Sequence, residues 1–345
     1  MQSIHGGDIY HYADIIDFSA NINPLGTPPS VLQAIIDSLP EVGNYPDIYC
    51  QKLREQIAKF HDVDREHVIC GNGAADLIFR LVLALQPKKA LVLAPCFAEY
   101  EQALKAVGAK VKHYKLNQKT FVLGADYRKA LTDNLDMVCL CNPNNPTGKT
   151  IDKELLEEVV IFCRQKKIWL LLDECFLDFL EDEQARTYLI DADKGAYLFV
   201  LRAFTKMYAV PGVRLGYGVC SDTGLLERMY QAGPPWNVST LAQTAGIAAL
   251  QEEKFVSQTR AYVKKEKAYL YREFTRLEIP YWEGEANYIF FRFKEGLKEK
   301  MIPHGILIRD CGNYQNLDST YYRIAVKTRE CNEKLIEALE KVMTE

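Results

Sequence analysis

The sequence predicts an α/β fold in which a large domain with a mostly parallel sheet is joined to a smaller α+β domain. Between about residues 47 and 235, helical patterns alternate with short apolar runs, which are typical of strands buried on both faces of a parallel sheet. After about residue 236 the pattern changes to two long helical stretches followed by shorter alternating strands. The chain of 345 residues is long enough for two domains with a sizeable core.

The large domain is expected at residues 31–235, and its strands are the short apolar runs. These runs lie at residues 90–94, 137–141, 168–173, 197–201 and 215–219. Helix start signals separate them, and Asp152, for example, precedes a helical pattern over residues 153–160. A strand-like run at 67–70 leads through a glycine-rich turn into a helical pattern at 77–85.

The smaller domain is expected at residues 236–345. Its predicted elements are helices at 238–251 and 254–277, strands at 287–293, 305–309 and 321–326, and a last helix at 331–343. Residues 1–30 contain few core-forming runs, so we expect this segment to pack back on the smaller domain. No linker rich in Gly or Ser marks the boundary near residue 235.

Composition argues against several classes of function. The 42 Lys and Arg against 46 Asp and Glu give a net charge of -4, which is unlike a nucleic-acid-binding protein. Apolar runs stay shorter than the roughly 18 residues of a membrane span, and the start does not resemble a secretory signal. Ten scattered cysteines show no disulfide framework, and Cys139 and Cys141 are too close for a usual zinc pair. We therefore expect a cytoplasmic protein with reduced thiols, no metal site, and no nucleic-acid or membrane partner.

Two residues carry the candidate chemistry, Lys206 and Asp173, the latter at the end of an apolar run. A lysine that can form a Schiff base and an aspartate that can pair with a pyridinium nitrogen together indicate pyridoxal phosphate (PLP) chemistry. Residues 142–148, Asn-Pro-Asn-Asn-Pro-Thr-Gly, follow a predicted strand at the edge where open α/β sheets bind ligands. The turn at residues 71–76 precedes a helix start, which is a common phosphate site.

The order of these motifs along the chain resembles that of the fold-type-I PLP-dependent aminotransferase family, and the resemblance covers essentially the whole chain. The resemblance rests on Asn-Pro-x-Asn-Pro-Thr-Gly, an Asp-Glu pair about 30 residues later, and Thr-Lys followed eight residues later by Arg. It implies that Lys206 holds PLP covalently and can move protons at the substrate Cα. It also implies that Asp173 keeps the pyridine nitrogen protonated through a charge-assisted hydrogen bond.

The same resemblance implies the remaining cofactor contacts. Asn145 would donate to the phenolic oxygen of PLP, and Phe97 would stack on its ring. The phosphate would be held by a set of small or cationic residues, namely Gly73, Ala74, Ala75, Thr205 and Arg214. Tyr45 matches a tyrosine that the family lends to the phosphate site of the other subunit, so the resemblance implies a homodimer.

The chain departs from the family pattern at three neighbours of the catalytic pair. Cys175 stands where Ala is usual, Phe176 where many relatives have Tyr, and Ala203 where a hydroxyl residue often contacts the phosphate. Phe176 removes one donor to the phenolic oxygen. The departures therefore alter single contacts and leave Lys206 and Asp173 in place.

Three regions narrow the resemblance within the family. They are residues 5–7 together with 17–26, residues 308–314, and residues 322–327. They resemble the threonine-phosphate decarboxylase branch more closely than the histidinol-phosphate aminotransferase branch, and imply a small phosphorylated amino acid as substrate. Arg309 and Arg323 would then anchor its two anionic groups, and His5 and Asn23 would add donors to the phosphate.

The motifs leave the reaction itself open. A substrate carboxylate in the plane of the cofactor ring gives transamination, whereas one rotated out of that plane gives decarboxylation. We expect decarboxylation of L-threonine O-3-phosphate to 1-aminopropan-2-ol O-phosphate, with a histidinol-phosphate or aromatic aminotransferase as the alternative. A third interpretation, a PLP-fold regulator, is disfavoured because no DNA-binding segment precedes Asp17. Which arginine binds which anion also stays open.

Overall fold

The computed structural model describes residues 5–344, and the largest sheet within them has seven strands in the order β2-β8-β7-β6-β5-β3-β4. The strands are β2 (Val68–Gly71), β3 (Lys89–Ala94), β4 (Lys110–Lys115), β5 (Met137–Cys141), β6 (Trp169–Asp173), β7 (Leu198–Ala203) and β8 (Gly216–Val219). Strands β3 to β7 pair in parallel, whereas β8 is antiparallel to both β7 and β2. The carboxyl ends of the other six strands therefore meet at one edge of the sheet.

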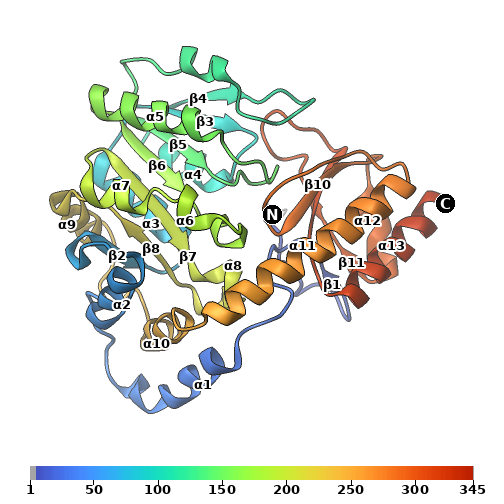
Figure 1. The fold of residues 1–345 in the computed structure, drawn as a ribbon, viewed down its shortest axis with the longest axis horizontal. Helices are drawn as coiled ribbons and strands as arrows, with labels where there is room; N and C mark the ends of the chain where they lie inside the picture. Colours follow the sequence, from blue (N-terminus) through green and yellow to red (C-terminus); the bar gives the residue numbers. More distant parts are fainter. Residues whose placement is uncertain (1–4, 345) are drawn as a thin grey trace.

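Helices cover both faces of this sheet, which explains why its central strands are continuous apolar runs. Apolar side chains of α3 (Ala74–Leu85), α4 (Ala98–Ala106) and α9 (Thr223–Gln231) form the core on one face. Those of α2 (Gln51–His61), α5 (Lys153–Lys166) and α7 (Leu189–Lys194) form the core on the other. Every residue of β5 and β7 is buried as a result. Figure 1 shows the layers, with α5 and α7 in front of the sheet.

A smaller antiparallel sheet lies beside the first, in the order β12-β13-β10-β9 (Figure 1). Its strands are β9 (Tyr281–Trp282), β10 (Tyr288–Arg292), β12 (Arg309–Asp310) and β13 (Tyr321–Ala325). The helices of this part are α11 (Glu253–Arg276), α12 (Leu297–Met301) and α13 (Arg329–Thr344). The long helix α11 extends from the larger part to the smaller one.

The N-terminal segment contacts both parts of the molecule. Strand β1 (Ile16–Asp17) pairs in parallel with β11 (Ile306–Leu307) of the smaller part. Helix α1 (Pro29–Asp37) packs on α10 (Thr240–Ala249). Short helices fill the connections, namely α6 (Glu183–Arg186), α8 (Phe204–Met207), η1 (Leu39–Gly43), η2 (Arg65–His67), η3 (Ala125–Lys129), η4 (Leu177–Phe179), η5 (Pro211–Val213) and η6 (Ile302–His304).

The predicted fold class is confirmed, with differences in detail. The predicted strand at 305–309 is two short strands, because β11 pairs with β1 while β12 pairs with β13. Strand β4 was not predicted, because its residues alternate between polar and apolar at the exposed edge of the sheet. The division into residues 1–30, 31–235 and 236–345 stays a prediction, and residues 1–4 and 345 lie outside the described chain.

The two parts meet where two glycine backbones touch. A Cβ built on Gly284 would lie 2.9 Å from the Cα of Gly148, which follows β5. The backbone N–H of Glu285 donates to the carbonyl of Gly148 at 2.7 Å, and the hydroxyl of Tyr288 donates to the carbonyl of Asn144 at 2.8 Å. The loop after β5 is therefore fixed directly against the smaller sheet.

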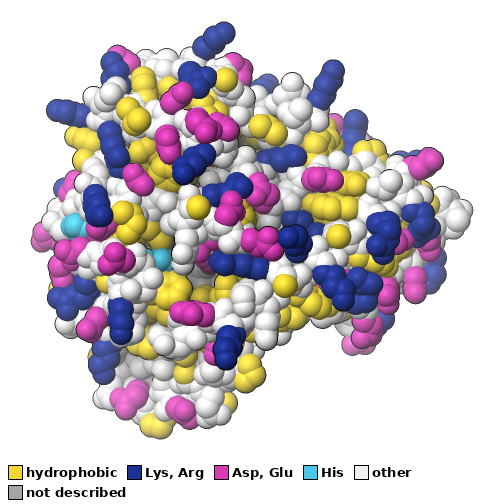
Figure 2. Space-filling view, in the orientation of Figure 1, with side chains coloured by type: hydrophobic (Ala, Val, Ile, Leu, Met, Phe, Trp, Pro, Cys, Tyr) yellow, Lys and Arg dark blue, Asp and Glu magenta, His cyan; other side chains and the backbone are white. Residues whose placement is uncertain are grey.

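The surface carries charges of both signs. Figure 2 shows Lys and Arg side chains interspersed with Asp and Glu over the face that it displays. None of the helices within residues 5–344 combines the length and the apolarity that crossing a membrane requires. In the same residues, no cluster of three or more His, Cys, Asp or Glu side chains is arranged to hold a metal ion.

Candidate active site

A cavity of about 380 Å³ lies at the carboxyl edge of the large sheet. Loops after β5, β6 and β7 and the first turn of α3 form one wall, and residues of the smaller sheet and the N-terminal segment form the other. This is the edge at which open α/β sheets bind ligands. Of the predicted site residues, all but Gly73, Tyr45 and Asn23 line this cavity.

Lys206 lies in α8, directly after β7, and its side chain lines the cavity. Burial, and next the positive charge of Arg323, lower the pKa of the Lys206 amine to about 8. A substantial fraction of the amine is therefore neutral near pH 7–8, and only the neutral amine is a nucleophile. Nζ of Lys206 lies over the ring of Phe176, 5.9 Å from its centroid.

Asp173 is the last residue of β6 and is buried. The hydroxyl of Tyr100 donates to its Oδ2 at 2.5 Å, and the backbone N–H of Cys175 donates to its Oδ1 at 2.9 Å. Burial raises the pKa of Asp173, whereas these donors and the nearby Lys206 act in the opposite direction. The carboxylate is thus held in a fixed orientation at the cavity wall.

Asn145 and Arg323 form a buried pair across the two parts of the molecule. Nη1 of Arg323 donates to Oδ1 of Asn145, and Nη2 donates to the carbonyl of Ser19 at 2.8 Å. Because Oδ1 of Asn145 already accepts a hydrogen bond, its Nδ2 is the atom that remains to donate to a ligand. Nε of Arg323 is buried and has no hydrogen-bond partner within residues 5–344, so a bound anion could satisfy it.

The first turn of α3 forms an anion cradle. Its N-cap, Gly73, has φ +81° and offers no side chain, so the backbone N–H groups of the turn lack a side-chain cap. A Cβ at Gly73 would lie 2.6 Å from Nη2 of Arg214, so glycine lets the guanidinium approach the helix end. Ala74, Ala75, Thr205 and Arg214 line the cavity here. Helix N–H groups, a guanidinium and a hydroxyl suit a phosphate.

The donor set fits PLP. It combines a nucleophilic amine, a buried carboxylate, an amide donor, an aromatic wall at Phe97 and an anion cradle in one cavity. Residues that could hold the cofactor are thus in place, with Phe176, Cys175 and Ala203 also lining the wall.

The cavity wall presents further cationic and polar groups. Arg309 is buried, donates to Oδ1 of Asn313 at 2.8 Å, and lies over the ring of Tyr314. His5 lines the same cavity, with its Nε2 2.9 Å from Oε1 of Glu99. These groups can therefore hold a second anion.

Asn23 is not brought to the cavity. Its Nδ2 donates to the carbonyl of Met207 and, at 2.8 Å, to Oγ1 of Thr259, and its Oδ1 accepts from the N–H of Leu25. The expectation that it contacts substrate therefore lacks support from the geometry. Asn21 lines the cavity instead, and its buried Oδ1 has no partner within residues 5–344. Sequence analysis missed Asn21, although it lies in the same Asn-x-Asn motif.

Tyr45 also lies outside the cavity. Its side chain is 79% exposed and stacks on Trp236 with the ring centroids 4.6 Å apart. Its expected contact is with a second subunit, and that expectation stays a prediction.

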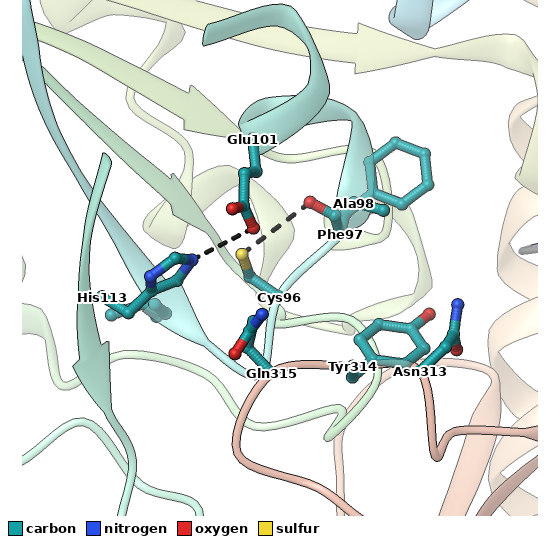
Figure 3. Close-up of a pocket in the computed structure, with 9 residues that line it drawn as sticks. Cys96, Phe97, Ala98, Glu101, His113, Asn313, Tyr314 and Gln315 are labelled. Atoms are coloured by element: carbon teal, nitrogen blue, oxygen red, sulfur yellow. Dashed lines mark hydrogen bonds and ion pairs between the residues drawn. The ribbon is translucent and has the colours of Figure 1, made fainter. Parts of the chain in front are cut away.

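A second cavity, of about 80 Å³, lies behind Phe97 and Tyr314, which line both cavities (Figure 3). It contains Cys96 and a pair formed by His113 and Glu101, whose Nε2 and Oε2 are 3.1 Å apart. Burial raises the pKa of the Cys96 thiol, which keeps it protonated. Lys206 and Asp173 do not line this smaller cavity, so the larger one is the candidate active site.

Known proteins are similar to this chain along almost its whole length. The family model described as aminotransferase class I and II matches residues 13–339. A threonine-phosphate decarboxylase of Salmonella typhimurium is 38% identical, covering 100% of this chain and 98% of the relative. The structure of the histidinol-phosphate aminotransferase from Clostridium acetobutylicum superposes with a TM-score of 0.88 at 29% identity, covering 94% of this chain and 98% of that one. The L-threonine-O-3-phosphate decarboxylase from Porphyromonas gingivalis gives a TM-score of 0.85 at 25% identity, covering 95% and 99%.

Proposed function

The chain belongs to the aminotransferase class I and II family, and we propose that it is a PLP-dependent decarboxylase of L-threonine O-3-phosphate. The observation that carries the proposal is that two buried guanidinium groups, Arg309 and Arg323, line the same cavity as Lys206. A substrate with a phosphate and a carboxylate needs two cationic anchors, and a guanidinium suits either anion. The Salmonella typhimurium relative, which carries this activity in its name, matches the whole chain.

Membership of the family implies PLP as the cofactor. When bound, PLP supplies an electron sink for the bond that breaks at the substrate Cα. Arg214, Thr205 and the first turn of α3 would hold its phosphate, and Asp173 would pair with the ring nitrogen. Nδ2 of Asn145 would donate to the phenolic oxygen, since Oδ1 is engaged by Arg323.

We assign each of the two arginines to one anionic group of the substrate according to the residues that surround it. Arg323 contacts Asn145, which would bind the cofactor, and has an unsatisfied Nε, so it would bind the substrate carboxylate. Arg309 is the cross-strand neighbour of Arg323 and lines the cavity together with His5 and Asn21, so it would bind the phosphate.

Lys206 would supply the proton that the reaction needs. Decarboxylation breaks the bond between Cα and the carboxylate, CO2 leaves, and a proton takes its place on Cα. A pKa of about 8 lets Nζ of Lys206 act as an acid or as a base near neutral pH. The fixed guanidinium of Arg323 would hold the carboxylate in the orientation in which it leaves.

A homodimer is part of the proposal. Apolar side chains are exposed along the N-terminal arm and the loop beside it, namely Leu32, Ile36, Leu39, Val42, Tyr45 and Trp236. Large exposed apolar side chains that lie near one another are typical of a protein interface, and Tyr45 stacks on Trp236 here. A second copy of the chain would cover this surface and receive Tyr45 near its own PLP phosphate.

The test supplies the PLP-loaded protein with L-threonine O-3-phosphate and measures CO2 together with amino transfer to 2-oxoglutarate. We expect CO2 and 1-aminopropan-2-ol O-phosphate, with no glutamate. The competing candidate is a histidinol-phosphate aminotransferase, which the similarity to the Clostridium acetobutylicum structure favours. Rapid glutamate formation from histidinol phosphate, without CO2 from threonine phosphate, would replace our proposal by that candidate.

A further inference from the structure

Residues 5–7 form a strap that connects the two sides of the active-site cavity. At one end, Nε2 of His5 lies 2.9 Å from Oε1 of Glu99, which belongs to α4 of the larger part. At the other end, the N–H of Gly7 donates to Oγ of Ser19 at 2.7 Å, just after β1. Since β1 pairs with β11 of the smaller part, the strap reaches from one part of the molecule to the other.

Glu99 is a buried carboxylate in the cavity wall, and one of its two oxygens lacks a hydrogen-bond donor in the described chain. It is only 8% exposed, and the oxygen without a donor is Oε2. His5 is the group that the structure places against its other oxygen. A buried carboxylate is costly unless a partner compensates it, so the contact favours the position of His5 against α4. The first turn of α4 also suits an anion, because of the helix dipole.

The strap forms part of the cavity wall, so its position determines where His5 lies. His5 and Gly6 both line the cavity. Gly6 packs so tightly that a Cβ would lie 2.3 Å from the carbonyl oxygen of Ser19. That same oxygen accepts the hydrogen bond from Nη2 of Arg323. Moving the strap would therefore displace His5 from the cavity wall, whereas the bond between Ser19 and Arg323 does not depend on the strap.

We propose that Glu99 is a positioning residue, which holds His5 and keeps the strap closed over the phosphate end of the bound substrate. The inference rests on the proposed function for the identity of that substrate. Glu99 contacts His5, whereas the reacting atoms lie beside Lys206. Its loss should therefore weaken substrate binding more than it slows turnover.

The first experiment measures steady-state kinetics of PLP-loaded Glu99→Gln with threonine phosphate. Glutamine keeps the volume and a hydrogen-bond acceptor but removes the charge, which roughly halves the strength of such a bond. We expect KM to rise about tenfold, kcat to stay within about twofold, and PLP affinity to stay unchanged. An unchanged KM, or a loss confined to kcat, would overturn the inference.

The matched control is Glu101→Gln on the same helix. Glu101 contacts His113 on the far side of Phe97, in the smaller cavity, and also pairs with Lys105, so it carries a glutamate–histidine contact away from the strap (Figure 3). It should keep the KM of the unaltered protein. A rise in KM equal to that of Glu99→Gln would show a general effect on α4 and would reject the strap.

The second experiment tests whether Glu99 acts through His5. His5→Gln should raise KM by itself, and Glu99→Gln should add little in the His5→Gln background, because the contact is already lost. Additive effects of the two substitutions would overturn the inference.

A third measurement separates the strap from the reaction. Amide hydrogen exchange of the N-terminal peptide, in the holoprotein with inorganic phosphate, reports the closure of the strap without turnover. We expect faster exchange at Gly6 and Gly7 in Glu99→Gln than in the unaltered protein or in Glu101→Gln. Equal exchange would reject the strap, whereas failure of threonine phosphate to yield CO2 would reject only the proposed function.

Discussion

The phenol of Tyr100 donates a hydrogen bond to Oδ2 of Asp173 at 2.5 Å, and both side chains are buried. The backbone N–H of Cys175 holds the other oxygen. Burial raises the pKa of Asp173, and the two donors counteract this rise by stabilising the ionised form. Tyr100 therefore helps to keep a buried carboxylate negatively charged where a pyridine nitrogen would need it.

Tyr100→Phe should raise the pKa of Asp173 further. A hydrogen bond to a charged group contributes about 1.5–3 kcal/mol, and its loss disfavours the ionised carboxylate. Because a carboxylate is ionised only above its pKa, the acid limit of cofactor binding should move to higher pH. A pH titration of PLP affinity and visible absorbance measures that limit. Tyr127→Phe is the control, since Tyr127 is equally buried but its hydroxyl has no partner in the described chain. The same acid limit in both variants would contradict the prediction.

Borohydride reduction of the PLP-loaded protein should fix the cofactor on Lys206. Burial lowers the pKa of its amine from 10.5 to about 8, and an amine is neutral above its pKa. PLP incorporation should therefore accelerate as pH rises and level off above about 8. Lys267 is the internal control, because burial also lowers its pKa to about 8 while its amine contacts the carbonyl of Gly284. Peptide mapping that finds the label on Lys267 would refute the assignment.

Arg309→Lys should weaken substrate binding although the charge is kept. An ammonium cannot reproduce two parallel guanidinium hydrogen bonds, so KM for threonine phosphate should rise about tenfold or more. Threonine without its phosphate should lose about a thousandfold in kcat/KM, because a phosphate accepts several such bonds. Arg292→Lys on the exposed side of β10 is the control and should leave both values unchanged. Comparable turnover of threonine and its phosphate would argue against a phosphate site at Arg309.

Sedimentation should show a particle of two chains. The exposed apolar side chains of the N-terminal arm and of Trp236 would be buried in a subunit interface. A closed two-fold dimer is the commonest oligomer of soluble proteins. Tyr45→Phe should keep the dimer but weaken PLP binding about tenfold, because it removes one donor to the phosphate. A fully active monomer would eliminate the intersubunit role of Tyr45.

The sequence predicted the fold class, and it also placed three candidate site residues at one edge of the sheet for a physical reason. Asp173 ends a buried strand, Lys206 and Asn145 each follow one, and parallel strands bring their carboxyl ends to one edge. Chain order alone therefore implies that these residues meet. Strand β4 escaped prediction, because an edge strand has only one covered face and lacks a continuous apolar run.

The sequence could not decide which of two asparagines faces the cavity. Asn21 and Asn23 lie in an irregular segment, where no helical or strand period fixes the direction of a side chain. Tertiary contacts decide it, since Thr259 and Met207 bind the amide of Asn23. Tyr100 was missed for a similar reason, because its bond to Asp173 depends on how α4 packs over the sheet.

The glycine contact between Gly148 and Gly284 makes the junction between the two parts as thin as two backbones allow. The thickness of this junction sets how closely Arg323, on the smaller sheet, approaches Asn145, whose loop ends at Gly148. The series Gly284→Ala, Gly284→Val and Gly284→Leu would act as a set of spacers of increasing width. We expect substrate affinity to fall stepwise along the series, while the amine of Lys206 stays reactive toward PLP. The geometry of substrate recognition in this enzyme would then depend on two glycines that contribute no side chain to the site.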